Sequence, residues 1–483
     1  MYKDNSQINI IEFISPFGEL DPENRWVKIA NMIPWQKYEE EYKSQFCEDN
    51  GAPAITFRMA MGTLIIKQQT DHSDSDVLQD ILENPYMQFL IGLHEFTKVP
   101  PFSVRSITNF RKYISAEMLN EINNNLFRGN KTQEDTDKND DNFPPSTGGG
   151  KPEEEPSNKG TLILDATCAP SDIAYPTDVN LLNEAREKLE KMIDTLQPQG
   201  YAKPKPRTYR RKARKDYLRF IKQKKPGYNK ARKAIGQQLR YIKRNLGHVA
   251  DMIEKFSIDS LSSNQKQWLE TIKKLYEQQL LMYKTRTHRV DNRIVSISQP
   301  HVRPIVRGKS RAPVEFGAKV SISLVDGYAF PDIVAWNNYN EEVQLIPAIE
   351  AFRKHNGYYP KRVLADTLYR NKMNRDYCKE RGIRLSGPAL GRPSKETDKA
   401  LLKQQSQDAR DRSPVEGKFG EGKAKYGLGR VMARIKESCE TVISMAFLCM
   451  NINRRLRILL SFFRLLQFFD IYWANRKFSW VFA

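Results

Sequence analysis

The sequence has little of what a zinc site or a disulfide framework requires. Its 483 residues include only five cysteines and six histidines. The cysteines are odd in number, scattered and never spaced as a CxxC pair, and the histidines lack the spacing of metal ligands. A metal site in this chain would therefore be built from carboxylates, and the thiols are expected to be reduced in a cytoplasmic protein.

Segments for export or membrane insertion are not apparent either. The first residues, MYKDNSQINIIEFISPFG, place Asp4 and Glu12 around a short apolar run, which is not the pattern of a secretory signal. Near the C-terminus, arginines interrupt the apolar stretch ETVISMAFLCMNINRRLRILLSFFRLLQFF well before the ~20 residues that a membrane span needs. We expect no membrane partner, and we interpret residues 456–483 as an apolar tail that packs on the domain or on another protein.

Acidic residues are outnumbered, because 78 Lys and Arg stand against 58 Asp and Glu and give a formal net charge of +20. Such an excess attracts a polyanion, of which nucleic acid is the commonest. An acidic membrane surface, or solubility alone, is the alternative interpretation.

Residues 1–128 show apolar positions at three- and four-residue steps, which predicts an all-α N-terminal domain. Several short helices joined by tight turns suit a DNA-binding domain of the helix-turn-helix kind, and they suit other small bundles equally well. Within PPFSVRSITNFRKY, the candidate DNA contacts are Arg105, Arg111 and Lys112, with a solvated helix end as the alternative. Residues 129–160 then turn polar, acidic and rich in Pro and Gly, which indicates a flexible linker.

From residue 161 onward the pattern is that of a mixed α/β domain, extending to about residue 455. Strands are predicted over 161–164, 294–298 and 320–324, followed by a helix, a strand that ends at Asp366, a further helix and a last strand. A helical insertion of about residues 190–290 separates the first strand from the second. The fold expected is therefore an α/β sheet flanked by helices, with a helical insertion.

The insertion contains a dense basic block between Lys203 and Arg244, in which Asp216 is the only acidic residue. Five aromatic residues are interleaved with the cations, so that phosphate contacts and ring stacking are both available. A solvated helical face is the alternative. The candidate DNA contacts here are Arg210, Arg211, Lys212, Arg214 and Lys215.

Two carboxylates follow apolar strands, Asp165 after TLIL and Asp366 after RVLA. Ligands bind at strand ends in α/β sheets, and an unpaired carboxylate there would be desolvated. A cation should therefore meet each of them, and Mg²⁺ is the natural candidate because it takes carboxylate and phosphate oxygens. Capping of the next turn by either aspartate is the alternative.

A third carboxylate, Glu416, lies four residues after Arg412 and seven before Lys423, which are the offsets of neighbours on one helix face. If this helix packs beside the strand ends, Asp165, Asp366 and Glu416 meet around two Mg²⁺ ions ~3.5 to 4 Å apart, with Mn²⁺ as the alternative ion. Arg412 and Lys423 would then face the nucleic-acid backbone. Taken alone, Glu416 would be interpreted as a surface ion pair with Arg412.

The spacing of Arg412, Glu416 and Lys423 resembles the Tyr, Arg, Glu, Lys signature of one branch of the DDE transposases of bacterial insertion sequences. Ala409 occupies the tyrosine position of that signature, so any role of the tyrosine is missing here. LILDATCAPSDIAYPTDVN and VLADTLYRNKMNRDYC are similar to the first and second aspartate blocks of the family. Residues 53–114 resemble its helical N-terminal domain.

This resemblance implies an RNase H-like catalytic domain in which Asp165, Asp366 and Glu416 are the catalytic residues and the metal ligands. It implies binding of terminal inverted repeats and target DNA, metal-dependent cleavage and strand transfer, and a homodimer or higher synaptic assembly at the bacterial nucleoid. Two alternatives stay open, a metal-dependent nuclease of the same fold and a non-catalytic DNA-binding protein.

Overall fold

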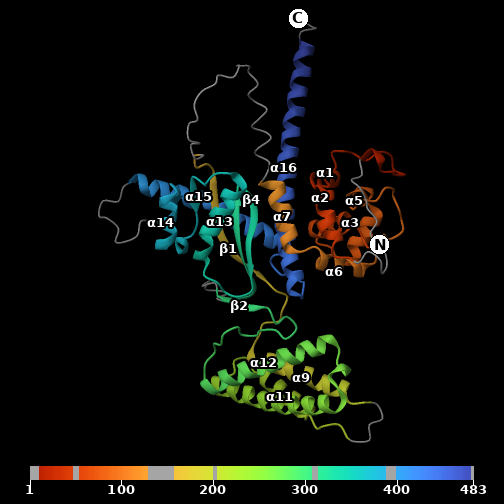
Figure 1. The fold of residues 1–483 in the computed structure, drawn as a ribbon, viewed down its shortest axis with the longest axis vertical. Helices are drawn as coiled ribbons and strands as arrows, with labels where there is room; N and C mark the ends of the chain where they lie inside the picture. The colour runs from red at the N-terminus through yellow and green to blue at the C-terminus, as the bar shows by residue number, and fades with distance from the viewer. Residues whose placement is uncertain are drawn as a thin grey trace.

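The computed structural model describes residues 10–46, 54–128, 157–198, 204–306, 314–387 and 399–479, with side chains as far as residue 459. Within these ranges the chain forms a helical N-terminal part, a mixed sheet with its helices, and a helical bundle inserted into the sheet domain (Figure 1). The predicted linker is largely outside the described residues, as are the side chains of most of the predicted C-terminal tail. None of the helices in the described ranges is long and apolar enough to span a bilayer.

The N-terminal part is all-helical, as predicted. After a 3₁₀ turn at Ile10–Glu12, its helices are α1 (Arg25–Met32), α2 (Trp35–Lys43), α3 (Phe57–Thr70), α4 (Asp74–Glu83), α5 (Pro85–Leu90), α6 (Val104–Tyr113) and α7 (Ala116–Phe127). Hydroxyl groups start three of them, because the side chains of Thr56, Ser73 and Ser115 each accept a hydrogen bond from the backbone N–H three residues later. These local caps explain why the helices were readable in the sequence.

The sheet is mixed, with the order β2-β3-β1-β5-β6 and β4 beside β3. Its strands are β1 (Thr161–Pro170), β2 (Arg303–Val306), β3 (Val314–Val325), β4 (Tyr328–Ala335), β5 (Arg362–Leu364) and β6 (Arg384–Leu385). The pairs β1–β3, β2–β3 and β3–β4 are antiparallel, whereas β1–β5 and β5–β6 are parallel. The prediction of a mixed sheet with flanking helices is confirmed.

The first strand is longer than predicted. Pairing with β3 extends it from the predicted end at Asp165 to Pro170, so Asp165 lies within β1. This extension depends on a distant partner strand, which a local apolar run cannot reveal. Gly317 permits the close pairing, because a Cβ there would lie 2.1 Å from the carbonyl oxygen of Ala169.

Helices cover both faces of the sheet. On one face, α13 (Leu345–Asn356) and α14 (Lys372–Glu380) share an apolar cluster with Leu162 and Leu164 of β1. On the other face, α15 (Lys399–Lys425) and α16 (Lys436–Ser479) share a cluster with Ile163 and Ile322. Two short 3₁₀ helices, η3 (Glu341–Gln344) after β4 and η4 (Thr367–Tyr369) after β5, contact each other.

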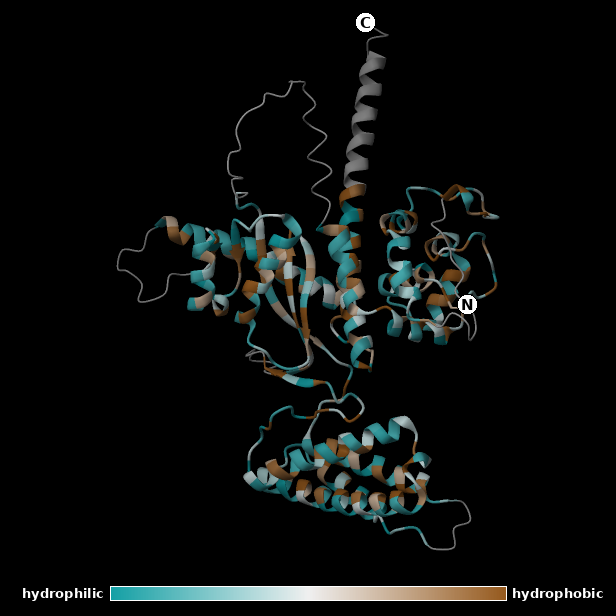
Figure 2. Cartoon of the chain, viewed as in Figure 1, coloured by the Kyte–Doolittle hydropathy of each residue, from teal (hydrophilic) through white to brown (hydrophobic). Residues whose placement is uncertain are grey.

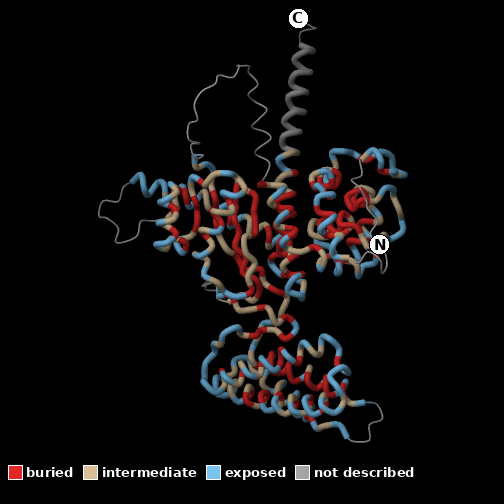
Figure 3. The backbone as a smooth tube through the Cα atoms, in the orientation of Figure 1, coloured by how far each residue is buried: buried red, intermediate tan, exposed pale blue. Residues whose placement is uncertain are grey.

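Helix α16 lies between the sheet and the N-terminal helices (Figure 1). It contacts β4 on one side and α3, α6 and α7 on the other, and one continuous apolar cluster includes residues of all these elements. The buried stretches in Figure 3 follow the central strands and the part of α16 next to them. The N-terminal helices are therefore mounted on the sheet domain, and α16 runs without a break past the predicted boundary at residue 456.

The insertion comprises α9 (Asp178–Leu196), α10 (Arg210–Ile221), α11 (Tyr228–Phe256), the 3₁₀ turn Ile258–Ser260 and α12 (Ser263–Thr285). It has an apolar cluster of its own, and Figure 2 shows hydrophobic residues interspersed along otherwise hydrophilic helices. The prediction of a strand over 294–298 is wrong, because these residues form no strand. Ile294 and Ile297 are instead buried in this bundle, and the Ile294 N–H donates to the side chain of Gln278.

Candidate active site

Asp165 lies on the face of β1 that α15 covers. Its Oδ1 accepts a hydrogen bond from the N–H of Ala166 at 2.8 Å. Burial raises the pKa of Asp165, the Ala166 N–H and Arg412 act against this rise, and the negative charges of Glu341 and Asp366 add to it. Asp165 is thus a partly desolvated carboxylate with two further acids in its electrostatic neighbourhood.

Asp366 follows β5, the strand that pairs in parallel with β1. The parallel register of β1 and β5 is Thr161↔Arg362 to Ile163↔Leu364, and Asp366 follows β5 by two residues, as Asp165 follows Ile163. The charge of Asp366 acts on Asp165, so the two carboxylates are electrostatic neighbours. The Oδ1 of Asp366 also accepts the N–H of Thr367 at 2.6 Å and so caps η4. The capping role considered from the sequence is therefore present, together with the position beside Asp165.

Glu416 lies on α15 with its side chain 67% exposed. Between it and the sheet lies Arg412, whose Nη1 is 3.6 Å from Asp165 Oδ2 and whose Nη2 is 3.9 Å from Glu416 Oε1. Both separations are ion-pair distances and are too long for hydrogen bonds. Arg412, predicted to face the nucleic-acid backbone, lies in this structure between two of the predicted metal ligands.

Two ion pairs that the sequence did not suggest hold α15 on the sheet. Arg384 of β6 donates to both carboxylate oxygens of Asp408 at 2.6 and 2.7 Å. Arg362 of β5 donates to Asp411 at 2.5 Å and to the hydroxyl of Thr161 at 2.7 Å. The available signal was the position of Asp408 four residues before Arg412, on the same side of a helix.

The donors at this site are of the right kind for a divalent metal ion, because Mg²⁺ prefers carboxylate oxygens. The three predicted ligands are not preassembled, however. Across the described ranges no group of three or more His, Cys, Asp or Glu side chains is close enough to hold an ion. Asp165 and Asp366 fit as a neighbouring pair, whereas Glu416 would have to approach from the far side of Arg412.

Glu341 is an acidic neighbour that the sequence analysis missed. It lies on η3, which contacts the η4 helix that Asp366 caps, and its carboxylate pairs with Lys319 at 2.8 Å. The charge of Glu341 raises the pKa of Asp165. Nothing in its local sequence distinguishes it, because its place depends on how β4 and η3 bring the chain back to β1.

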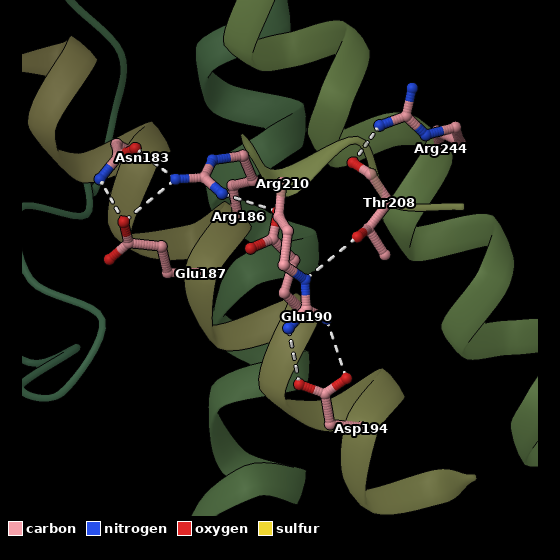
Figure 4. A network of polar contacts seen from close by, with 8 residues as sticks. All are labelled: Asn183, Arg186, Glu187, Glu190, Asp194, Thr208, Arg210 and Arg244. Atoms are coloured by element: carbon pink, nitrogen blue, oxygen red, sulfur yellow. Dashed lines mark hydrogen bonds and ion pairs between the residues drawn. The ribbon is translucent and has the colours of Figure 1, made fainter. Parts of the chain in front are cut away.

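The predicted DNA contacts fall into two groups. Arg105 and Lys112 are exposed on α6, and Arg211, Lys212, Arg214 and Lys215 are exposed on α10. Arg111 instead donates to Asp74 at 2.7 Å and joins α6 to α4. Arg210 is held by Asp194 through two hydrogen bonds of 2.8 and 3.0 Å (Figure 4).

Figure 4 shows the polar contacts that surround Arg210 in the basic insertion. Arg210 also contacts the hydroxyl of Thr208, and the carbonyl of Thr208 accepts from Arg244 of α11. Arg186 and Glu190, both buried on α9, are paired at 2.6 Å beside this contact. Arg210 thus anchors the start of α10, while the cations that follow it stay in solvent. On α15, Ala409 is exposed and Lys423 is half-buried.

Comparison with known proteins gives two family matches. The model described as "Transposase DDE domain" matches residues 363–453, which include Asp366 and Glu416, and the model described as "Transposase domain (DUF772)" matches residues 16–113. A protein of Rhizobium meliloti described as "Uncharacterized protein ORF8 in nfe locus" is 30% identical over 170 residues, which is 35% of this chain and 73% of that protein. No solved structure matches the chain significantly.

Proposed function

Since the chain belongs to the DDE transposase family, we propose that it binds the terminal inverted repeats of an insertion sequence and catalyses cleavage and strand transfer of the element's ends. Family membership itself carries the coarser statements. The chain is a DDE-type enzyme of DNA transposition, it binds DNA, and its chemistry depends on a divalent metal ion.

One observation carries the assignment of the site, namely that Asp165 on β1 and Asp366, two residues after the neighbouring parallel strand β5, are electrostatic neighbours on strands that α15 contacts. We assign Asp165, Asp366 and Glu416 as the ligands of two Mg²⁺ ions, for which Mn²⁺ is an alternative. When bound, such ions lower the pKa of a water nucleophile and offset the charge of the phosphoryl group.

The chain's own contribution is to place these carboxylates. The N–H of Ala166 donates to one oxygen of Asp165, and the N–H of Thr367 donates to one oxygen of Asp366. These hydrogen bonds orient the two side chains before DNA binds. The Arg384–Asp408 and Arg362–Asp411 pairs set the position of α15, and with it that of Glu416.

End recognition is assigned to the exposed face of α6. Arg105, Asn109 and Lys112 lie on that face at helical spacing, and α6 contains no acidic residue. Arginine and asparagine are the side chains that read guanine and adenine in the major groove. Thr441 of α16 donates to the carbonyl of Ile114 at 3.0 Å, which ties the end of α6 to the helix that follows the catalytic helix.

The exposed cations of α10 are assigned to target or flanking DNA. Arg211, Lys212, Arg214 and Lys215 lie on a helix whose only acid, Asp216, is bonded by Tyr241. Contacts of this kind bind phosphates without reading bases. Because two ends must be cut and joined together, the acting species is proposed to be a homodimer or a higher synaptic assembly.

The test is an assay of cleavage and strand transfer on duplexes that carry the element's end, with Mg²⁺ or Mn²⁺. Asp165→Asn, Asp366→Asn and Glu416→Gln should each lose cleavage and keep end binding, while Glu380→Gln, an exposed carboxylate on α14, should keep both. Joining of a precleaved end separates a transposase from a nuclease of the same fold. Metal-dependent nicking excludes a protein that only binds DNA, and persistent cleavage by Asp165→Asn would refute the site.

A further inference from the structure

The position of Arg412 differs from that of the other arginines around α15. Arg384 and Arg362 each hold their carboxylate partners through hydrogen bonds of 2.5 to 2.7 Å. Arg412 meets Asp165 and Glu416 only at 3.6 and 3.9 Å, beyond hydrogen-bonding range. The guanidinium is therefore held by the charge of the two carboxylates and not by hydrogen bonds. Because the side chain is 27% exposed, the guanidinium can also reach solvent.

Electrostatics makes this position of Arg412 unfavourable for a metal ion at the same carboxylates. The charge of Arg412 offsets part of the repulsion that Asp165 experiences from Asp366 and Glu341. A divalent ion held by Asp165 and Glu416 would lie close to the guanidinium, and like charges a few ångströms apart repel strongly at a partly buried site. Arg412 and the ion therefore compete for the same oxygens.

DNA offers the displaced guanidinium a better partner. The planar fork of arginine matches a phosphate with two parallel hydrogen bonds, which the present contacts with Asp165 and Glu416 do not provide. The backbone of α15 need not move, because Asp408 and Asp411 hold it on the sheet. The exchange would then involve the side chains of Arg412 and Glu416, of which Glu416 is 67% exposed.

We propose that Arg412 is an exchangeable counter-ion, which offsets part of the charge of Asp165 and Glu416 until a DNA phosphate takes its guanidinium and leaves the carboxylates to the metal. This inference rests on the proposed function, because it assumes the metal site at Asp165. Its consequence is coupling: DNA raises the affinity for metal, and metal raises the affinity for DNA by the same factor. The enzyme would then assemble its charged centre mainly on DNA.

The experiment measures Ca²⁺ binding to the full chain by calorimetry, with and without a duplex that is checked for integrity afterwards. Ca²⁺ is a hard cation with the same oxygen preference. We expect the duplex to tighten Ca²⁺ binding to the wild type by about tenfold, within the usual range of such couplings. Arg412→Ala should bind Ca²⁺ about tenfold more tightly than the wild type without DNA and show little further gain when DNA is added.

Arg410→Ala is the matched control, because Arg410 is exposed two residues away and points to the opposite side of the same helix. It should behave like the wild type, and Arg412→Lys should keep part of the coupling. The exchange is overturned if Arg412→Ala binds Ca²⁺ no more tightly than the wild type, or if the duplex leaves wild-type affinity unchanged. Ca²⁺ binding that survives Asp165→Asn unchanged would instead refute the metal site of the proposed function.

Discussion

The carboxylate of Asp408 accepts two hydrogen bonds from the guanidinium of Arg384 and joins α15 to the edge strand β6. Asp408 is only 8% exposed, so the pair is largely removed from solvent on the carboxylate side. One helical turn later α15 carries Arg412, and one further turn later Glu416. The pair therefore helps to determine where α15 lies over β1, the strand that carries Asp165.

Asp408→Asn should alter the position of Glu416, although Asp408 is not itself a proposed metal ligand. The change removes a charge from a half-buried pair and leaves Arg384 poorly satisfied, which should cost about 2 kcal/mol of unfolding free energy. Cleavage of end DNA should fall about tenfold or more because Glu416 is displaced. Urea denaturation and a cleavage time course measure the two effects. Asp376→Asn, an exposed carboxylate on α14, should change neither, and a fully active Asp408→Asn would contradict the positioning role.

The basic surface of α10 predicts a salt effect. Replacing both Lys212 and Lys215 with alanine should weaken duplex binding and lower the slope of log K against log salt by about 2 if each contacts one phosphate. Arg210→Ala should act differently, because Arg210 anchors α10 to Asp194 and its loss should loosen the helix. Fluorescence anisotropy over a salt series separates these outcomes. An unchanged slope in the double variant would remove α10 from the DNA interface.

Local signals predicted the parts of the fold that depend on local contacts. The N-terminal helices follow their capping hydroxyls, and Asp165 and Asp366 were predicted as site residues because each follows a short apolar run. The true end of β1 at Pro170 depends on β3, which is separated from β1 by the whole insertion. The strand prediction over 294–298 was wrong because it also depended on a distant partner. The helices of the insertion bury Ile294 and Ile297, and no strand pairs with this segment.

The polar contacts around Asp165 could not be predicted from the sequence. Helical spacing placed Arg412 and Glu416 on one face, but it could not show that this face meets Asp165. Arg362 and Arg384 lie on the short strands β5 and β6. Their partners, Asp411 and Asp408, lie on α15, which is distant in the sequence. Glu341 comes near Asp165 only in the folded chain. Pairings of this kind are long-range and cannot be read from local periodicity.

Glu39 predicts a pH dependence of stability. It is buried on α2, where its carboxylate accepts the N–H of Phe57 at 3.2 Å, and burial raises its pKa from 4.5 to about 7. The folded chain therefore holds a proton between these values that the unfolded chain has released, so this group makes stability fall as pH rises from about 4.5 to about 7. Above pH 7 the charged carboxylate is buried at full cost.

Glu39→Gln should remove that dependence. At pH 8 the variant should be more stable than the wild type by roughly 1–3 kcal/mol, and near pH 5 the two should be similar. Thermal unfolding of both proteins across this range is the measurement. Glu40→Gln, an exposed neighbour on the same helix, should follow the wild type at each pH. A constant difference between Glu39→Gln and the wild type would show that the carboxylate does not titrate as inferred.

Asn451 joins the N-terminal helices to the sheet through α16. Its Nδ2 donates to Asn123 of α7 at 2.8 Å and to the carbonyl of Ala329 on β4 at 2.7 Å, and its Oδ1 accepts the Ala329 N–H at 2.9 Å. The side chain is fully buried. Asn451→Leu should therefore remove the partners of Asn123 Oδ1 and of the Ala329 N–H, while the Ala329 carbonyl keeps the Asn123 Nδ2 donor, and cost about 2–4 kcal/mol.

Because α6 packs on the same helix, the lost connection should also reduce cleavage more than end binding, since DNA held by α6 would no longer be fixed relative to Asp165. Comparing denaturation, end binding and cleavage of Asn451→Leu with those of Asn229→Leu, an exposed position on α11, tests this coupling. Equal losses of binding and cleavage would show that α16 contributes stability alone.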